Sequence, residues 1–172
     1  MVEKRGMRAE DLQELKSVKN PELSPDGTRF VFVQTVINKE KHEYNSHLFV
    51  GNLQEGTIEQ WTFGDVRDSS PKWSPDGKAI VFVSNRSGKS QLHLLQTSGG
   101  EARKLTNCNH GVTNPVWSPD GKKILFATSI KPNDKMNANE NEVMCKEKKW
   151  IRKNLNLWLL REFVTNLIQL DF

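Results

Sequence analysis

The sequence contains little cysteine and no long apolar segment. Cys108 and Cys145 are the two cysteines in 172 residues, with no CxxC pair and no His/Cys spacing of the kind that holds zinc. Neither a disulfide framework nor a metal site is predicted. No run of about 18 apolar residues is present to span a membrane, and the first residues lack the apolar region of a secretory signal. These absences predict free thiols, no metal, no cofactor, no membrane span and a cytoplasmic location.

The net charge of +4 is spread unevenly along the chain. The segment from Cys145 onward holds six Lys or Arg and three Asp or Glu, which leaves 19 basic and 18 acidic groups before it. A phosphate-binding face needs clustered positive charge. The first 144 residues have nearly balanced charge and do not supply such a face. The sequence therefore predicts no nucleic-acid partner.

The most informative motif is the tetrapeptide SPDG, which occurs three times. Its serines are 50 and 44 residues apart, a period typical of propeller blades. Proline presets the second position of a tight turn, aspartate suits the third position and glycine takes the last. The residues predicted to form these structural turns are Ser24, Pro25, Asp26, Gly27, Trp73, Ser74, Pro75, Asp76, Gly77, Trp117, Ser118, Pro119, Asp120 and Gly121.

An apolar segment without polar alternation follows each SPDG turn. Strands of this kind are typically buried on both faces. Further short apolar segments and glycine-containing links predict a third and a fourth strand in each repeat, and four antiparallel strands make one propeller blade. The predicted second strands are 30–33, 80–83 and 124–127, the third strands 47–50 and 91–95, and the fourth strands 58–62 and 102–106.

The predicted fold is all-β: an incomplete β-propeller of four-stranded antiparallel blades, with two complete blades and part of a third. Leu12 and Leu15 are three residues apart, which predicts a short N-terminal helix. An irregular or helical tail is expected at the other end. The predicted segments are a lead-in at 1–20, a partial propeller at 21–135 with blades near 21–66, 67–110 and 111–135, and a non-propeller tail at 136–172.

No catalytic residue is predicted. The blade Trp and Phe residues are expected to pack between sheets, and Asp26, Asp76 and Asp120 are expected to serve their turns. No G-x-S-x-G nucleophile elbow is present. The string SGKS at 87–90 is not a phosphate loop, because the first glycine of that motif would fall at Val83 within a predicted strand.

Three segments resemble a known family. They are AEDLQELKSVKNPELSPDGTRFVFV, WSPDGKAIVFVSNRSGKSQLHLLQTSGGEARKLT and GVTNPVWSPDGKKILF. Over about residues 8–130, they are similar to the N-terminal propeller of acylaminoacyl-peptidase-like members of the prolyl oligopeptidase family of serine peptidases. The resemblance implies a larger protein in which the complete propeller caps an α/β-hydrolase domain and filters the peptides that reach it.

The family's catalytic Ser, Asp and His have no counterpart in this chain. The resemblance therefore predicts a non-catalytic propeller fragment of a serine peptidase, inactive alone, whose full-length relatives act on peptides. Single SPDG blades also occur in Tol-type propellers, so a free-standing module for protein–protein interaction is the alternative. Either interpretation allows a protein partner, or self-association through exposed blade edges.

The segment after Asn141 departs from the blade pattern and has no turn signal. One interpretation is an amphipathic helix that lies on a membrane or a partner. The other is a frameshift after about residue 146, which would give a truncated product. Read one base back, the codons of residues 148–172 can encode KEMDKKELKPLVVERICYKSDTAGF, which resembles the segment that leads to the next blade in the family. The nucleotide sequence tests this prediction, which requires further SPDG repeats and a G-x-S-x-G motif in the other frame.

Overall fold

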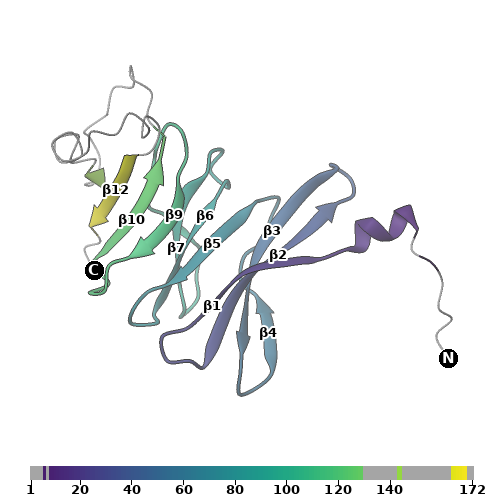
Figure 1. The fold of residues 1–172 in the computed structure, drawn as a ribbon, viewed down its shortest axis with the longest axis horizontal. Coiled ribbons are helices and arrows are strands. Elements are labelled where there is room, and N and C mark those ends of the chain that lie inside the picture. The colour runs from purple at the N-terminus through teal and green to yellow at the C-terminus, as the bar shows by residue number, and fades with distance from the viewer. Residues whose placement is uncertain (1–5, 7, 130–142, 145–163, 170–172) are drawn as a thin grey trace, which may run out of the picture.

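The computed structural model describes residues 6, 8–129, 143–144 and 164–169. Three four-stranded antiparallel sheets stand side by side, and a short 3-10 helix precedes them (Figure 1). We name the sheets blades 1, 2 and 3. Their elements are η1 Ala9–Glu14; β1 Ser17–Leu23, β2 Arg29–Asn38, β3 Glu43–Asn52 and β4 Thr57–Gln60 in blade 1; β5 Asp68–Trp73, β6 Ala79–Ser84, β7 Gln91–Gln96 and β8 Arg103–Lys104 in blade 2; and β9 Thr113–Trp117, β10 Lys123–Thr128, β11 Val143–Met144 and β12 Val164–Gln169 in blade 3.

Blades 1 and 2 each use four consecutive strands. Their orders are β1-β2-β3-β4 and β5-β6-β7-β8, with every neighbouring pair antiparallel. Each SPDG turn connects the first strand of a blade to the second, as the local turn chemistry predicts. The prediction of an all-β fold built from four-stranded antiparallel blades is confirmed.

Blade 3 differs from the expectation. Its order is β11-β12-β10-β9, so its two outer strands come from the segment expected to be an irregular or helical tail. β12 pairs with β10 in the same register that β7 takes with β6, because Lys123 lies opposite Gln169 as Ala79 lies opposite Gln96. The expected third blade without outer strands is thus corrected: an unpaired β10 edge is occupied by the strand at Val164–Gln169.

The fourth strands are shorter than predicted because a threonine side chain takes over the pairing. The Leu48 N–H donates to Thr62 Oγ1 at 2.8 Å, and the Leu92 N–H donates to Thr106 Oγ1 at 2.9 Å. Both threonines are buried. A hydroxyl therefore satisfies a main-chain donor that a longer β4 or β8 would otherwise pair.

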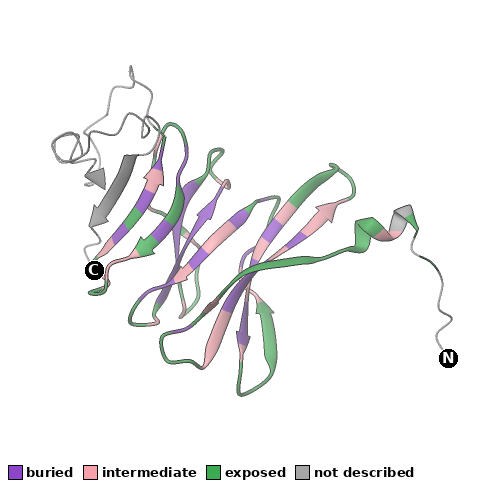
Figure 2. Cartoon of the chain, viewed as in Figure 1, coloured by how far each residue is buried: buried purple, intermediate pink, exposed green. Residues whose placement is uncertain are grey.

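The core consists of two apolar clusters, each between adjacent blades. Strand β6 of blade 2 contributes to both clusters. Ile80 and Phe82 pack against blade 1, and Val81 and Val83 pack against blade 3. This explains why every residue of β6 is buried, as the unbroken apolar segment predicted. In Figure 2 the buried residues follow the central strands, while much of β1 and β4 is exposed.

The predicted N-terminal helix is present as η1, one short 3-10 segment. Lys39 forms an ion pair with Glu14 at its end, which ties η1 to the β2–β3 hairpin. Leu12 and Leu15 are both about half exposed. Among the described residues no helix has the length and apolar character needed to cross a membrane.

Candidate functional site

The SPDG turn of blade 2 is held by its own side chains. The Ser74 hydroxyl donates to Asp76 Oδ1 at 2.6 Å and accepts the Ala79 N–H at 2.9 Å. The same carboxylate oxygen accepts the Lys78 N–H at 3.1 Å. Gly77 takes a φ of +70°, a conformation that glycine adopts without strain. The serine, the aspartate and the glycine of the motif are therefore all used within the turn.

Blades 1 and 3 repeat this network. Ser24 donates to Asp26 and Ser118 donates to Asp120, while Gly27 and Gly121 take φ values of 71° and 70°. The serine hydroxyl, followed by a main-chain N–H, lowers the pKa of the Asp26 carboxyl to about 2. The pKa values of the other two carboxyls are lowered for the same two reasons. Ionised carboxylates that accept two internal hydrogen bonds serve the turn rather than acid–base chemistry.

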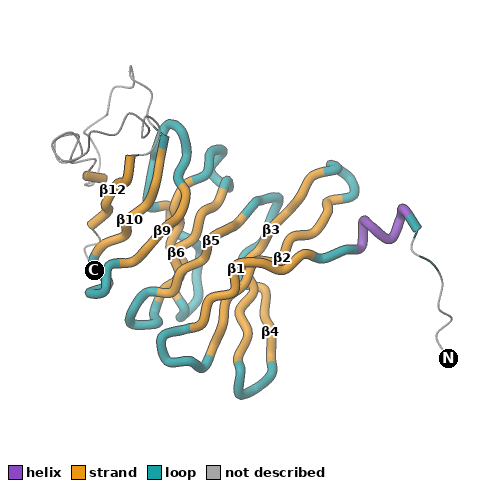
Figure 3. The backbone as a smooth tube through the Cα atoms, viewed as in Figure 1, coloured by secondary structure: helices purple, strands orange, loops and turns teal. Residues whose placement is uncertain are grey.

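Successive turns lie next to one another at one end of the sheets, drawn as loops in Figure 3. A Cβ atom placed on Gly77 would lie 3.8 Å from Pro25, and one on Gly121 would lie 3.7 Å from Pro75. The structure thus brings the predicted turn residues together as a row. In blades 2 and 3 the glycine of the turn lies against the proline of the preceding blade's turn, whereas Gly27 of blade 1 has no such neighbour among the described residues.

The tryptophans before the turns connect the blades. Trp73 Nε1 donates to the main-chain oxygen of Glu22 at 3.2 Å, and Trp117 Nε1 donates to the main-chain oxygen of Lys72 at 3.1 Å. Each indole therefore bonds the first strand of the preceding blade. Leu23 takes the tryptophan position in blade 1 and has no donor to offer.

The first strands share an irregularity that the sequence did not reveal. Asn20, Ser70 and Asn114 all have positive φ values, of 53°, 51° and 53°. Each precedes a proline, and the pairing register shifts at these positions in all three blades. A proline has no N–H for the sheet, so a bulge accommodates it. The sequence signal was the proline three residues before each SPDG serine, which predicted only an extended lead-in.

These bulges line a hollow of about 270 Å³ on the first strands of the three blades, which we name the inner-strand hollow. β1 lies beside β5 and β5 beside β9, as first strands do around the central channel of a propeller. The nine residues that line the inner-strand hollow are Asn20, Pro21, Glu22, Ser70, Pro71, Lys72, Asn114, Pro115 and Val116.

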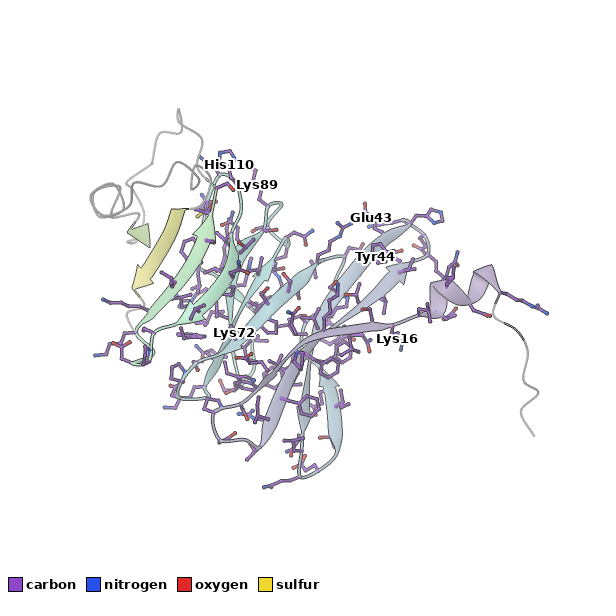
Figure 4. The ribbon with its side chains drawn as sticks, viewed as in Figure 1. Lys16, Glu43, Tyr44, Lys72, Lys89 and His110 are labelled. Carbon is purple, nitrogen blue, oxygen red and sulfur yellow. The ribbon has the colours of Figure 1, made fainter. Side chains whose placement is uncertain are left out.

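An ion pair crosses the inner-strand hollow. Lys72 Nζ lies 2.6 Å from Glu22 Oε2, and the two side chains are 40% and 32% exposed. Figure 4 shows Lys72 in the middle of the molecule, far from Glu43 and Tyr44 at the tip of the β2–β3 hairpin. The hollow thus offers proline rings, main-chain groups and one opposite pair of charges. Such groups can contact a peptide.

A buried ion pair lies near the other end of blade 2. Arg86 Nη2 contacts both carboxylate oxygens of Asp68, at 3.1 and 2.9 Å, and its Nε donates to Ser84 at 2.9 Å. The Asp68 side chain is fully buried. The Arg86 guanidinium also lies 5.2 Å from the ring centre of Phe82. Sequence reasoning missed this pair, because its partners are 18 residues apart, one at the start of β5 and the other in the β6–β7 turn.

Two histidines lie near this ion pair, His93 buried and His47 half-buried. Burial lowers the pKa of His47 and of His93, which favours the neutral form of both side chains. His93 Nδ1 lies 3.2 Å from the main-chain oxygen of Gln91. His47 Nδ1 is buried and has no hydrogen-bond partner among the described residues. Within that part of the chain, no group of three or more His, Cys, Asp or Glu side chains could hold a metal ion.

Comparison with known proteins agrees with this architecture. A family model described as the TolB beta propeller domain, PD40, matches residues 7–152. The uncharacterized peptidase YuxL of Bacillus subtilis is 40% identical over 111 residues, which are 64% of this chain and 17% of YuxL. Dipeptidyl-peptidase 5 of Porphyromonas gingivalis is 35% identical over 78 residues, 45% of this chain and 11% of that protein. The chain thus spans less than a fifth of these two relatives.

A solved structure shows the same fold. The acylaminoacyl peptidase of Pyrococcus horikoshii matches 77% of this chain and 20% of its own, at 22% identity and a TM-score of 0.59. With the YuxL match, this confirms the resemblance to the propeller region of prolyl oligopeptidase-family peptidases. The family match covers the repeat region in which the SPDG turns lie.

Proposed function

Since this chain belongs to the TolB β-propeller domain family, we propose that it is the non-catalytic propeller part of a peptidase-type protein and controls which peptides pass along its first strands. The likeness to the peptidase YuxL supports the peptidase context. The chain spans only 17% of YuxL, so the match by itself does not give this protein a peptidase activity. That the complete protein acts on peptides is therefore proposed.

The inner-strand hollow is the observation that carries this proposal. Three blades present the same bulge, so the hollow combines one charge pair with repeated apolar proline surfaces. A peptide main chain supplies donors and acceptors for the exposed main-chain groups, and its charged termini or side chains suit Glu22 and Lys72. The hollow selects by fit and charge, while bond cleavage would belong to a separate catalytic domain.

Nuclear magnetic resonance of the full chain tests the peptide contact. Addition of a short unstructured peptide is expected to shift the amide resonances of Glu22, Lys72 and Val116. The resonances of Tyr44 and Lys89 should stay in place, since Figure 4 shows both residues far from Lys72. Shifts confined to those distant residues, or no shifts at millimolar peptide, would contradict the proposal.

Matched variants separate the charge pair from the apolar surface. Lys72→Met and Glu22→Gln each remove one charge and keep a side chain of similar length. Each is expected to weaken binding of a zwitterionic peptide several-fold, because exposed charge pairs contribute up to about 1 kcal/mol. Tyr44→Phe, at the hairpin tip, is the control and should leave binding unchanged.

The proposal also includes absence of peptidase activity in the chain alone. A chromogenic acylated amino-acid substrate should be hydrolysed no faster than in buffer. Hydrolysis that purifies with the chain and survives removal of contaminating peptidases would show that a catalytic group had been overlooked. A cytoplasmic location, proposed with this role, is checked by cell fractionation.

A second candidate is a free-standing propeller module that binds a protein partner. The observation in its favour is the exposed apolar surface on the two outermost blades, at Leu23, Ile58, Val116 and Leu125. The two functions differ in the surface that is used. A partner that shifts these resonances and leaves those of Glu22 and Lys72 unchanged would favour the module.

A further inference from the structure

The two interfaces between blades follow one rule of pairing. In each, a row of side chains on the later blade packs against a row on the preceding blade. We name the row on the later blade the back row and the row on the preceding blade the front row. The back row of blade 2 contains Trp73, Ile80 and Leu95, which lie opposite one another in the sheet and are all buried against blade 1.

The front rows follow from the same register. In blade 2, Lys72, Val81 and Leu94 lie opposite one another, and Val81 and Leu94 are buried against blade 3. In blade 1, Val31 and Val50 hold the corresponding positions and are buried against blade 2. Each blade thus has one face of each kind.

Blade 1 carries a back row that no described residue covers. Leu23, Phe30, Gly51 and Ile58 lie opposite one another across its four strands. Leu23 and Ile58 are each 58% exposed. By comparison, Trp73 in the same position of blade 2 is 6% exposed and Ile80 is fully buried.

Blade 3 carries the matching front row, which no blade of the described part of the chain covers. Val116 lies opposite Leu125, and these residues are 51% and 39% exposed. Val81, in the position of Leu125 in blade 2, is fully buried. The described residues therefore expose two complementary apolar faces, one on blade 1 and one on blade 3.

The two free rows also differ from the internal rows in a matched way. At the internal interfaces a tryptophan indole bonds the main-chain oxygen of a charged residue, Glu22 or Lys72. At the free faces Leu23 replaces the tryptophan and Val116 replaces the charged residue. Both positions become apolar together, as direct contact between them requires.

We propose that two copies of this chain associate head to tail, with the front row of blade 3 in one copy packed on the back row of blade 1 in the other. Continuity with the two internal interfaces supports this contact. Two copies provide six blades, which is within the range of about four to eight at which propellers close. Both contacts can then form in one ring with two-fold symmetry.

Sedimentation velocity of the full chain tests the association. The wild-type chain is expected to sediment as a dimer, with twice the 19.7 kDa mass of one chain. Leu125→Lys damages every front row and Leu23→Lys damages every back row, so each variant alone should be monomeric. The expected increase in dissociation constant is about tenfold or more, because an unpaired charge would enter an apolar contact.

Mixing the two variants distinguishes this contact from nonspecific association of apolar surfaces. The Leu23→Lys chain retains Val116 and Leu125, and the Leu125→Lys chain retains Leu23, so one intact contact can form between them. A one-to-one mixture should recover dimers that neither variant forms alone. Tyr44→Lys adds the same charge at the hairpin tip and should remain dimeric.

Circular dichroism verifies that each variant keeps its sheets, and recovery on mixing itself requires folded chains. A wild-type chain that stays monomeric at 100 μM, or a mixture that stays monomeric, would overturn the proposal. So would a Tyr44→Lys chain that dissociates as fully as Leu125→Lys.

Discussion

The indole Nε1 of Trp73 lies 3.2 Å from the main-chain oxygen of Glu22, 51 residues earlier in the chain. Trp117 makes the same bond one blade later, with Lys72. Because the acceptor is a main-chain atom, the bond does not depend on the side chain at that position. The acceptor position of the preceding blade can therefore hold a charged residue of either sign, Glu22 or Lys72.

Trp73→Phe should destabilise the chain by about 1 to 3 kcal/mol. The change removes one hydrogen bond between blades and leaves a gap in a site that is 6% exposed. Urea unfolding followed by circular dichroism measures the loss. Trp117→Phe should behave alike, whereas Trp61→Phe, whose indole bonds no described residue, should lose less. Equal losses for all three variants would remove the hydrogen bond from the explanation.

The SPDG turns predict a decline of stability in acid. Hydrogen bonds from the Ser24 hydroxyl and the Thr28 N–H lower the pKa of Asp26 to about 2, against 3.8 for a free side chain. The stabilising contribution is present above pH 4 and is lost as the pH falls toward 2, where the folded carboxylate is protonated. Urea midpoints measured between pH 7 and pH 2 should fall across this window.

Ser24→Ala tests the cause of that shift. Without the hydroxyl, the pKa of Asp26 should rise toward 3.8, while Asp120 keeps its donor Ser118 and its lowered pKa. Titration of the carboxyl carbons by nuclear magnetic resonance follows both groups in one sample. An unchanged Asp26 titration would assign the shift to main-chain donors alone.

Local turn chemistry made the blades predictable, whereas contacts between blades were not. Pro75, Asp76 and Gly77 act within a few residues of one another, so their pattern is visible in the sequence. Trp73 was expected to pack, but its acceptor depends on how two sheets are placed. Ser70 was not expected at positive φ, because a residue before proline normally favours an extended backbone.

The pairing of β12 with β10 was also beyond the sequence pattern. The segment Val164–Gln169 has no turn signal before it, and its partner Lys123–Thr128 belongs to a distant part of the chain. The repeat pattern did predict that a third strand should pair with β10, but no segment was assigned to that position. The fold places a strand there because an unpaired central edge leaves main-chain groups without partners.

The Asp68–Arg86 pair predicts a strong and non-additive effect. Arg86→Met would leave a fully buried carboxylate without its partner and should destabilise the chain by about 3 to 5 kcal/mol. Asp68→Asn combined with Arg86→Met should lose less than the sum of the single changes, because the stranded charge is removed as well. Chemical unfolding of the three variants measures the coupling, and additive losses would argue against a paired role.

Arg86→Lys provides a matched control for charge. Lysine keeps the positive charge but cannot contact both oxygens of Asp68 with one planar group or cover the Phe82 ring in the same way. The variant should therefore lie between the wild type and Arg86→Met in stability. Wild-type stability would show that the charge alone is sufficient.

Gly51→Ala tests the aromatic face of blade 1. A Cβ atom on Gly51 would lie 2.3 Å from Cζ of Phe30, so the ring would have to move away from its stack with Phe32. Overpacking of this kind should cost about 1 to 3 kcal/mol. Phe30→Leu shortens the side chain and should relieve much of the clash, so the double variant should be more stable than Gly51→Ala alone. A thermal unfolding cycle measures this coupling, and strictly additive changes would show that the ring does not depend on the glycine.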